Sequence, residues 1–128
     1  MIIESNVNQI YDNNQGLISL QKIESHEQFQ EWIHKENVIA LFTADWCPDC
    51  QVIEPVLPDI ENTFSNYTFI EVDRDRFIDI CQEYEIFGIP SFIAFHNGEE
   101  TGRFVSKDRK TKAEIVEFIE RLPNGLQS

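Results

Sequence analysis

One apolar run constrains the fold of this chain of 128 residues more than any other segment. Positions 38–42 are all apolar, and Thr43 follows them before the chain turns more polar. A short run that is apolar on both faces is typical of a strand buried in a parallel sheet, because helices cover both sides of such a sheet. We therefore predict a central strand over Val38–Thr43 with helices above and below it.

Two cysteines follow this strand at the spacing of one helical turn. The sequence Trp46-Cys47-Pro48-Asp49-Cys50 comes directly before apolar residues that recur at helical spacing. Pro48 suits the first helical position, which needs no backbone donor. The strand would deliver Cys47 to the helix N-terminus, where free N–H groups favour a thiolate. Cys50, one turn further on, would lie close enough to form a disulfide with Cys47, which suggests electron exchange with the disulfides of other proteins.

The rest of the chain alternates between strand and helix patterns. Strand patterns lie at Leu17–Ile23, Tyr67–Val72, Ser91–Phe95 and about Glu100–Val105. Helix patterns follow Ser25, run from Phe77 to Tyr84, and begin again at about Thr111. Asn97-Gly98 predicts a hairpin between the last two strands. Because right-handed crossovers would make the first three strands parallel, we predict an α/β fold with a mixed sheet, a C-terminal hairpin and helices on both faces.

Local signals predict where some helices begin and break. Ser25, with Gln28 three residues later, is the pattern of a capping box. Pro55 and Pro58 lie inside the helix that starts at the cysteines, and each removes a backbone donor. We therefore expect this helix to kink or break within about Glu54–Asp59.

The two ends of the chain carry weaker patterns. Residues 1–16 are rich in Asn and Gln and lack a convincing period, so we predict a mobile extension with a short helix around Asn6–Tyr11. Pro123 and Gly125 are expected to end the last helix. The predicted domain thus spans residues 17–122, followed by a tail over residues 123–128.

Charge and cysteine content limit the possible functions. The formal net charge is −13, so nucleic acid or an anionic membrane would be bound against electrostatic repulsion. No apolar run approaches the roughly 20 residues that span a bilayer. The N-terminal residues include no basic residue and no sustained apolar core, so we do not expect them to form a signal peptide. Three cysteines fit a redox pair and one inert buried thiol, Cys81, better than a disulfide framework. We expect a cytoplasmic monomer that binds neither nucleic acid nor a membrane.

Zinc binding is the chemical alternative for a Cys-x-x-Cys pair. Structural zinc would need two further ligands at suitable spacing. The candidates in the sequence lack that spacing: Cys81, His26, His34 and His96. We therefore expect no metal and no other cofactor beyond a redox-active disulfide between Cys47 and Cys50.

Taken together, these motifs resemble the thioredoxin family. The resemblance covers about Leu17–Leu122 and rests on four features in order: the Trp46-Cys47-Pro48-Asp49-Cys50 motif, Pro55, Gly88-Ile89-Pro90 and Asn97-Gly98. It implies the thioredoxin fold and a protein-disulfide reductase. It also implies that Cys47, the more exposed thiol, attacks a target disulfide and that Cys50 then resolves the mixed disulfide.

The resemblance further implies a substrate surface and partners. Pro90 is similar to the family's cis-proline, which faces the two cysteines and would expose the Ile89 backbone to an extended substrate. The residues expected to contact substrate are Trp46, Pro48, Asp49, Gly88, Ile89 and Pro90, with Val105 beside them. The expected partners are disulfide-containing proteins and a flavin-dependent thioredoxin reductase.

Two positions depart from the family pattern. Thioredoxins usually carry a buried Asp on the central strand, thought to help deprotonate the resolving thiol, and Leu41 stands at that position here. A water or another group must then take the proton from Cys50. The second departure is Pro48-Asp49 in place of Gly-Pro. The Asp49 charge is favourable at a helix N-terminus but opposes a neighbouring thiolate.

The first departure gives a testable prediction. Replacing Leu41 with aspartate is expected to raise the turnover of a small disulfide substrate roughly fivefold, because a positioned base accelerates a step that needs deprotonation. Turnover of the variant and the natural chain would be compared at equal dithiothreitol, with circular dichroism to verify the fold. A folded variant with no gain would contradict the prediction.

Two other functions are consistent with the sequence. A reductase of low-molecular-weight mixed disulfides, like a glutaredoxin, is disfavoured because no glycine pair follows the hairpin to hold a thiol peptide. A thioredoxin-fold binding module with little catalytic activity is compatible with Leu41. The intact cysteine pair argues against that third function.

Overall fold

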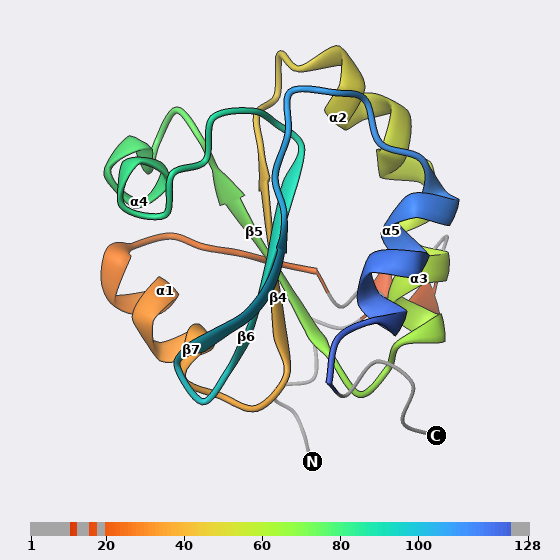
Figure 1. The fold of residues 1–128 in the computed structure, drawn as a ribbon, viewed down its shortest axis with the longest axis horizontal. Coiled ribbons are helices and arrows are strands. Elements are labelled where there is room, and N and C mark those ends of the chain that lie inside the picture. Colours follow the sequence, from red (N-terminus) through yellow and green to blue (C-terminus); the bar gives the residue numbers. More distant parts are fainter. Residues whose placement is uncertain (1–10, 13–15, 18–19, 124–128) are drawn as a thin grey trace.

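A five-stranded mixed sheet forms the centre of the molecule (Figure 1). The computed structural model describes residues 11–12, 16–17 and 20–123. The strands are β3 (Gln21–Lys22), β4 (Val38–Thr43), β5 (Thr68–Asp73), β6 (Ser91–His96) and β7 (Glu99–Phe104), in the order β3-β5-β4-β6-β7. β3, β4 and β5 are parallel to one another, β6 pairs antiparallel with β4, and β7 pairs antiparallel with β6 at the edge of the sheet. The predicted sheet with its C-terminal hairpin is confirmed.

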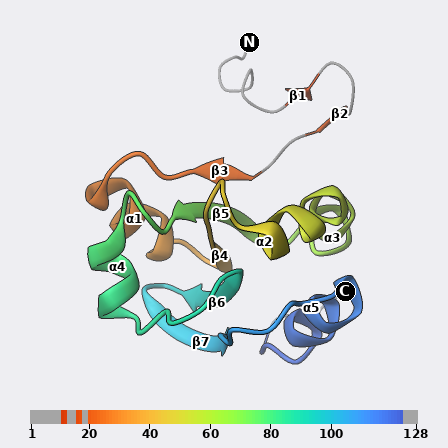
Figure 2. The same cartoon turned by 90° about the horizontal axis from the view of Figure 1, so that it is seen from above.

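Helices cover both faces of the sheet (Figure 2). One face carries α1 (His26–Ile33) and α4 (Ile78–Glu83), and the other carries α2 (Pro48–Ile53), α3 (Leu57–Thr63) and α5 (Lys112–Glu120). Alternate residues of β4 belong to the two resulting cores: Val38, Ala40 and Phe42 to one, and Ile39 and Leu41 to the other. This explains why the strand is apolar on both faces.

The helix that starts at the cysteines breaks where the prolines predicted. α2 ends at Ile53, and a 3-10 segment, η2 (Glu54–Val56), separates it from α3. Pro55 lies in the first turn of η2, and Pro58 lies in the first turn of α3. Backbone N–H groups in a first turn have no acceptor within the helix, so neither proline removes a helical hydrogen bond. The break leaves the cysteines on a helix of their own.

The capping box predicted at Ser25 is half formed. The Gln28 backbone N–H donates to Ser25 Oγ at 3.1 Å, so Ser25 is the N-cap of α1. The Gln28 side chain accepts instead from the backbone N–H of Glu24, one residue before the cap. A reciprocal box occurs at α5, where Thr111 and Glu114 cap each other's backbone.

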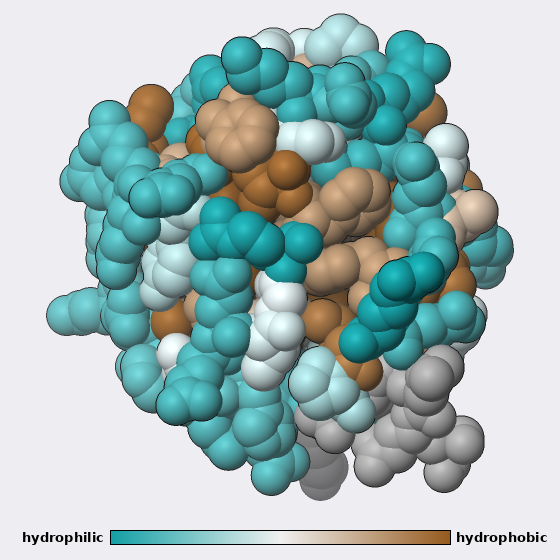
Figure 3. Space-filling view, in the orientation of Figure 1, coloured by the Kyte–Doolittle hydropathy of each residue, from teal (hydrophilic) through white to brown (hydrophobic). Residues whose placement is uncertain are grey.

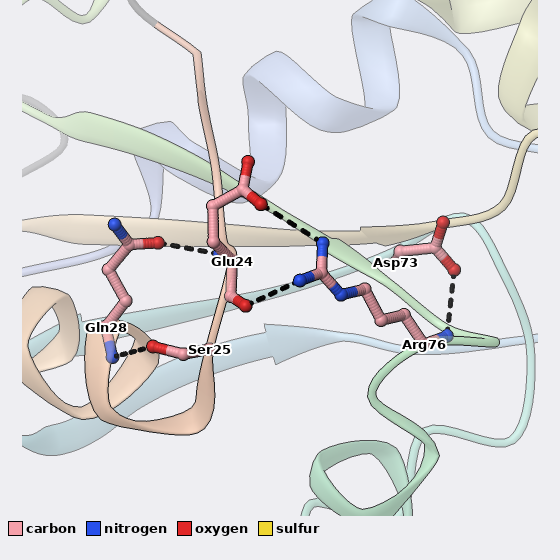
Figure 4. Close-up of polar contacts among 5 residues, drawn as sticks. All are labelled: Glu24, Ser25, Gln28, Asp73 and Arg76. Carbon is pink, nitrogen blue, oxygen red and sulfur yellow. Dashed lines mark hydrogen bonds and ion pairs between the residues drawn. The ribbon is translucent and has the colours of Figure 1, made fainter.

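Arg76 ties the end of β5 to the loop before α1 (Figure 4). Its guanidinium donates to the Glu24 carboxylate at 3.2 Å and to the Glu24 carbonyl oxygen at 2.7 Å. Asp73 Oδ1 accepts from the backbone N–H groups of Asp75 and Arg76 at 2.8 and 3.1 Å. These bonds fix the turn that follows β5 at the C-terminal edge of the parallel strands.

The first predicted strand is shorter than expected. Among the described residues of Leu17–Ile23, β3 is the part that joins the main sheet, as an edge strand paired with β5. The start of that range instead lies in β2 (Gly16–Leu17), which pairs antiparallel with β1 (Tyr11–Asp12). Local pairing across a short connection thus replaces part of the long-range ladder. The predicted helix around Asn6–Tyr11 is wrong at Tyr11, and residues 6–10 lie outside the described residues.

Candidate active site

The two cysteines lie just past the C-terminal end of β4. Cys47 is the N-cap residue of α2, and Pro48 takes the first helical position. The backbone N–H of Cys50 donates to Cys47 Sγ at 3.1 Å. Both cysteines carry free thiols in this structure. The fold therefore brings the predicted pair together at the start of a helix.

The expectation that Cys47 is the more exposed thiol is wrong. Cys47 is 3% exposed and Cys50 is 6% exposed, so both are buried. Cys47 packs in the same core as Ala44 and Ile89, and its sulfur lies 3.9 Å from the Ile89 carbonyl oxygen. The two thiols therefore differ in their position on the helix rather than in exposure.

Cys50 holds its proton at neutral pH. Burial, together with the hydrogen bond to Cys47, raises the pKa of the Cys50 thiol to about 11. A thiol with that pKa ionises to a negligible extent near neutrality. Any reaction in which Cys50 attacks another sulfur must therefore remove this proton first.

The segment before β6 faces the cysteines. The Ile89–Pro90 peptide bond is cis, as the resemblance implies, and the Ile89 carbonyl oxygen lies 3.9 Å from Cys47 Sγ. Gly88 packs against the backbone of the loop after β7. A Cβ at this position would lie 2.3 Å from the carbonyl oxygen of Ser106. Only glycine allows this close approach.

Trp46 is exposed, and residues of the turn after β5 contact its indole ring. It is 55% exposed, and its indole N–H donates to Asp75 Oδ2 at 2.6 Å. The Arg74 guanidinium carbon lies 5.1 Å from the centre of the indole ring.

Figure 3 shows that apolar side chains gather on one face of the molecule within a hydrophilic border.

The alternating charges of Asp73-Arg74-Asp75-Arg76 predict a solvated helix entry with local ion pairs rather than a binding site. A local ion pair occurs between Arg74 and Asp75, whereas Arg76 pairs with Glu24, 52 positions away in the chain. The contacts of Arg74 and Asp75 with Trp46 were missed. A signal was present, because β4 and β5 are parallel and their carboxyl ends share one edge of the sheet.

Two cations of the loop before α5 support the site. Arg109 Nε donates to Asp49 Oδ1 at 3.0 Å, which places a positive charge beside the first turn of α2. Lys110 is 1% exposed, and its ammonium donates to Ser106 O, Ser106 Oγ and Asp108 O at 3.1–3.2 Å. Burial lowers the pKa of Lys110. Sequence reasoning missed both, since a charged run normally indicates a solvated loop.

Three further features bear on the expected functions. Among the described residues, no three or more His, Cys, Asp or Glu side chains are grouped to hold a metal ion. Cys81 is buried, and burial raises the pKa of its thiol to about 11, which fits the expected inert thiol. Within the same residues, no helix has the length and apolar character needed to cross a bilayer.

The chain is similar to known thioredoxins throughout its described core. The family model named Thioredoxin matches residues 20–121. A thioredoxin of Callithrix jacchus is 33% identical over 104 residues, which cover 78% of this chain and 99% of that protein. Thioredoxin-2, mitochondrial, of Schizosaccharomyces pombe is 31% identical over 101 residues and 76% of each chain.

A solved thioredoxin structure is also similar to this chain. The thioredoxin of Malassezia sympodialis superposes with a TM-score of 0.67 at 31% identity, covering 81% of this chain and 96% of that one. The match favours a thiol–disulfide oxidoreductase over the two alternative functions. The chain therefore belongs to the thioredoxin family, whose members are protein-disulfide oxidoreductases.

Proposed function

We propose that the protein reduces disulfides of other proteins, with Cys47 as the nucleophile and Cys50 as the resolving cysteine. One observation carries the proposal: Cys47 is the N-cap of α2 and its sulfur accepts the Cys50 backbone N–H at 3.1 Å. Backbone donors at a helix N-terminus stabilise a developing thiolate. Burial raises the pKa of Cys50 to about 11, so Cys50 stays protonated until the mixed disulfide is resolved.

The proposed cycle has two exchange steps. The Cys47 thiolate attacks one sulfur of a target disulfide, which forms a mixed disulfide and releases the other target sulfur as a thiolate. Cys50 then loses its proton and attacks Cys47 Sγ, so the mixed disulfide breaks and the second target sulfur leaves. Two electrons have passed to the target, and a Cys47–Cys50 disulfide remains.

We assign the substrate contacts to the surface around Cys47. Trp46 supplies an exposed aromatic face, and Gly88-Ile89-Pro90 presents backbone next to the Cys47 sulfur. An extended substrate segment would pair with this backbone as an added strand. Pro48 and Asp49, at the start of α2, complete the surface.

The partners and location follow from the same proposal. A flavin-dependent thioredoxin reductase would return the disulfide to the dithiol. We further propose that the chain acts as a cytoplasmic monomer, although the S. pombe relative is named as mitochondrial. Residues 17–122 would form the thioredoxin-like domain, with 1–16 as an extension and 123–128 as a tail.

Replacing Cys50 with serine should trap the substrates. Without a resolving thiol, the mixed disulfide at Cys47 cannot be released by the second exchange. In cells that express the variant, we expect covalent adducts that dithiothreitol reverses, with partners identified by mass spectrometry. The matched control carries serine at both Cys47 and Cys50 and should trap none. Equal trapping by this control would contradict Cys47 as the nucleophile.

A further inference from the structure

The proposed function requires a group that takes the Cys50 proton, and the structure offers one. The following inference rests on that function. Cys50 borders a cavity of about 300 Å³ at the C-terminal edge of the sheet. Leu41 and three carboxylates, those of Asp45, Glu54 and Glu71, line the same cavity. Cys50 therefore borders a space that contains groups able to accept a proton.

The sheet register directs Glu71 toward this cavity. Leu41 of β4 is the in-register partner of Glu71 on β5. In-register residues on neighbouring strands point to the same face of a sheet. Leu41 is 4% exposed and cannot accept a proton, so β5 supplies the carboxylate that β4 lacks. Glu71 is half-buried, whereas Asp45 and Glu54 are exposed to solvent.

The electrostatic surroundings suit Glu71 to this task. Burial raises the pKa of its carboxyl, Lys22 on β3 opposes the shift, and the charges of Glu54, Asp45 and Asp73 add to it. Because basicity rises with pKa, such a carboxylate takes a proton from a thiol more readily than an exposed one. Glu71 then releases the proton to solvent after the exchange is complete, outside the step in which Cys50 attacks.

We propose that Glu71 accepts the Cys50 proton across this cavity during resolution of the mixed disulfide. The cavity has room for water, which occupies roughly 30 Å³ per molecule, and its polar lining, which includes Thr43 and Glu71, provides hydrogen-bond partners for a bridging water. The proton passes from Cys50 Sγ through that water to the Glu71 carboxylate. The Cys50 thiolate then attacks Cys47 Sγ, the Cys47–substrate bond breaks, and the substrate leaves as a thiolate.

Glu71→Gln tests this role, because glutamine keeps the size and polarity of the side chain but cannot accept the proton. The probe is a symmetrical aromatic disulfide whose thiolate absorbs visible light. One thiolate is released when Cys47 attacks and a second when Cys50 resolves. In single turnover at pH 7, we expect an unchanged first phase and a second phase about tenfold slower. The deficit should shrink toward pH 9, because hydroxide then deprotonates Cys50 directly.

Three further variants separate a proton acceptor from a structural role. Glu54→Gln removes an exposed carboxylate from the same cavity and should change the second phase less than about twofold. Glu71→Asp keeps an acceptor and should retain most of the rate. Leu41→Asp in the Glu71→Gln background should restore the second phase, because the carboxylate returns on the neighbouring strand.

Stability provides an independent readout. A carboxyl whose pKa is raised in the folded state favours folding when protonated, and this contribution is lost as the pH rises through its folded pKa. At pH 7, Glu71→Gln should therefore melt at a higher temperature than the natural chain, and the gain should disappear near pH 4. If Glu71 had a purely structural role, Glu71→Gln would instead melt at a lower temperature than the natural chain.

The possible outcomes are distinct. If the natural chain releases both thiolates and Glu71→Gln releases the second at the same rate, the Glu71 inference is wrong and the proposed function stands. An equal slowing of the second phase by Glu54→Gln would also overturn the Glu71 inference, because any negative charge near Cys50 would then have the same effect. If the natural chain releases neither thiolate, the proposed function itself fails.

Discussion

Replacement of Cys47 with serine is expected to abolish the reduction of insulin disulfides with dithiothreitol as the electron donor. The loss should exceed about a thousandfold relative to the natural chain, because a hydroxyl does not replace a thiolate in attack on a disulfide sulfur. The rate would be followed as turbidity from the precipitating insulin B chain, after subtraction of the rate with dithiothreitol alone.

The third cysteine provides the matched control. Cys81 is buried on α4, and alanine keeps its small apolar character, so Cys81→Ala should reduce insulin within about twofold of the natural rate. Residual activity of a tenth or more in Cys47→Ser would contradict the assignment of Cys47. A large loss in a folded Cys81→Ala variant would show that the third thiol takes part in the reaction.

Gly88→Ala is expected to have the second largest effect, on both stability and activity. The added Cβ would lie 2.3 Å from the Ser106 carbonyl oxygen and 2.8 Å from Lys107 Cα. These are backbone atoms, so either the loop after β7 or the segment before Pro90 must move. We expect a loss of about 3 kcal/mol in the free energy of unfolding, measured in urea, and a fall in insulin reduction of about tenfold.

Gly102→Ala is the control for a substitution at glycine in general. Its Cβ would meet the end of the Leu122 side chain at 2.5 Å, and a terminal methyl group can rotate away. The expected loss is about 1 kcal/mol, with activity unchanged. Equal losses in the two variants would show that the backbone contact at Gly88 does not set the position of the Ile89 backbone.

The central part of the fold was predictable because a short-range pattern reports it directly. The strand Val38–Thr43 was predicted with its observed bounds, since all but its last residue are buried between two helical layers. The helix break at Pro55 and Pro58 follows from missing backbone donors, which is a local property. Spacing alone placed Cys47 and Cys50 in the first turn of a helix.

The remaining features depend on contacts between segments far apart in the chain. Glu71 meets the cavity beside Cys50 only through the pairing of β4 with β5. Lys110 is buried because the loop that contains it folds back over its own carbonyl oxygens. The short β3 was overestimated because an edge strand with one neighbour has fewer contacts to fix its length. Local sequence patterns do not report these contacts between distant segments.

The position of Cys47 as the N-cap of α2 couples the state of its sulfur to the backbone. N-caps are usually oxygen acceptors and contribute about 1 kcal/mol to the stability of a helix. Here a free sulfur accepts the Cys50 backbone N–H. Once that sulfur is bonded to another, it cannot carry a negative charge and becomes a weaker acceptor, so the hydrogen bond from the Cys50 N–H should weaken on oxidation. Amide hydrogen exchange at Cys50 would then differ between the dithiol and disulfide forms, and a partner that binds this turn could tell them apart without touching either sulfur.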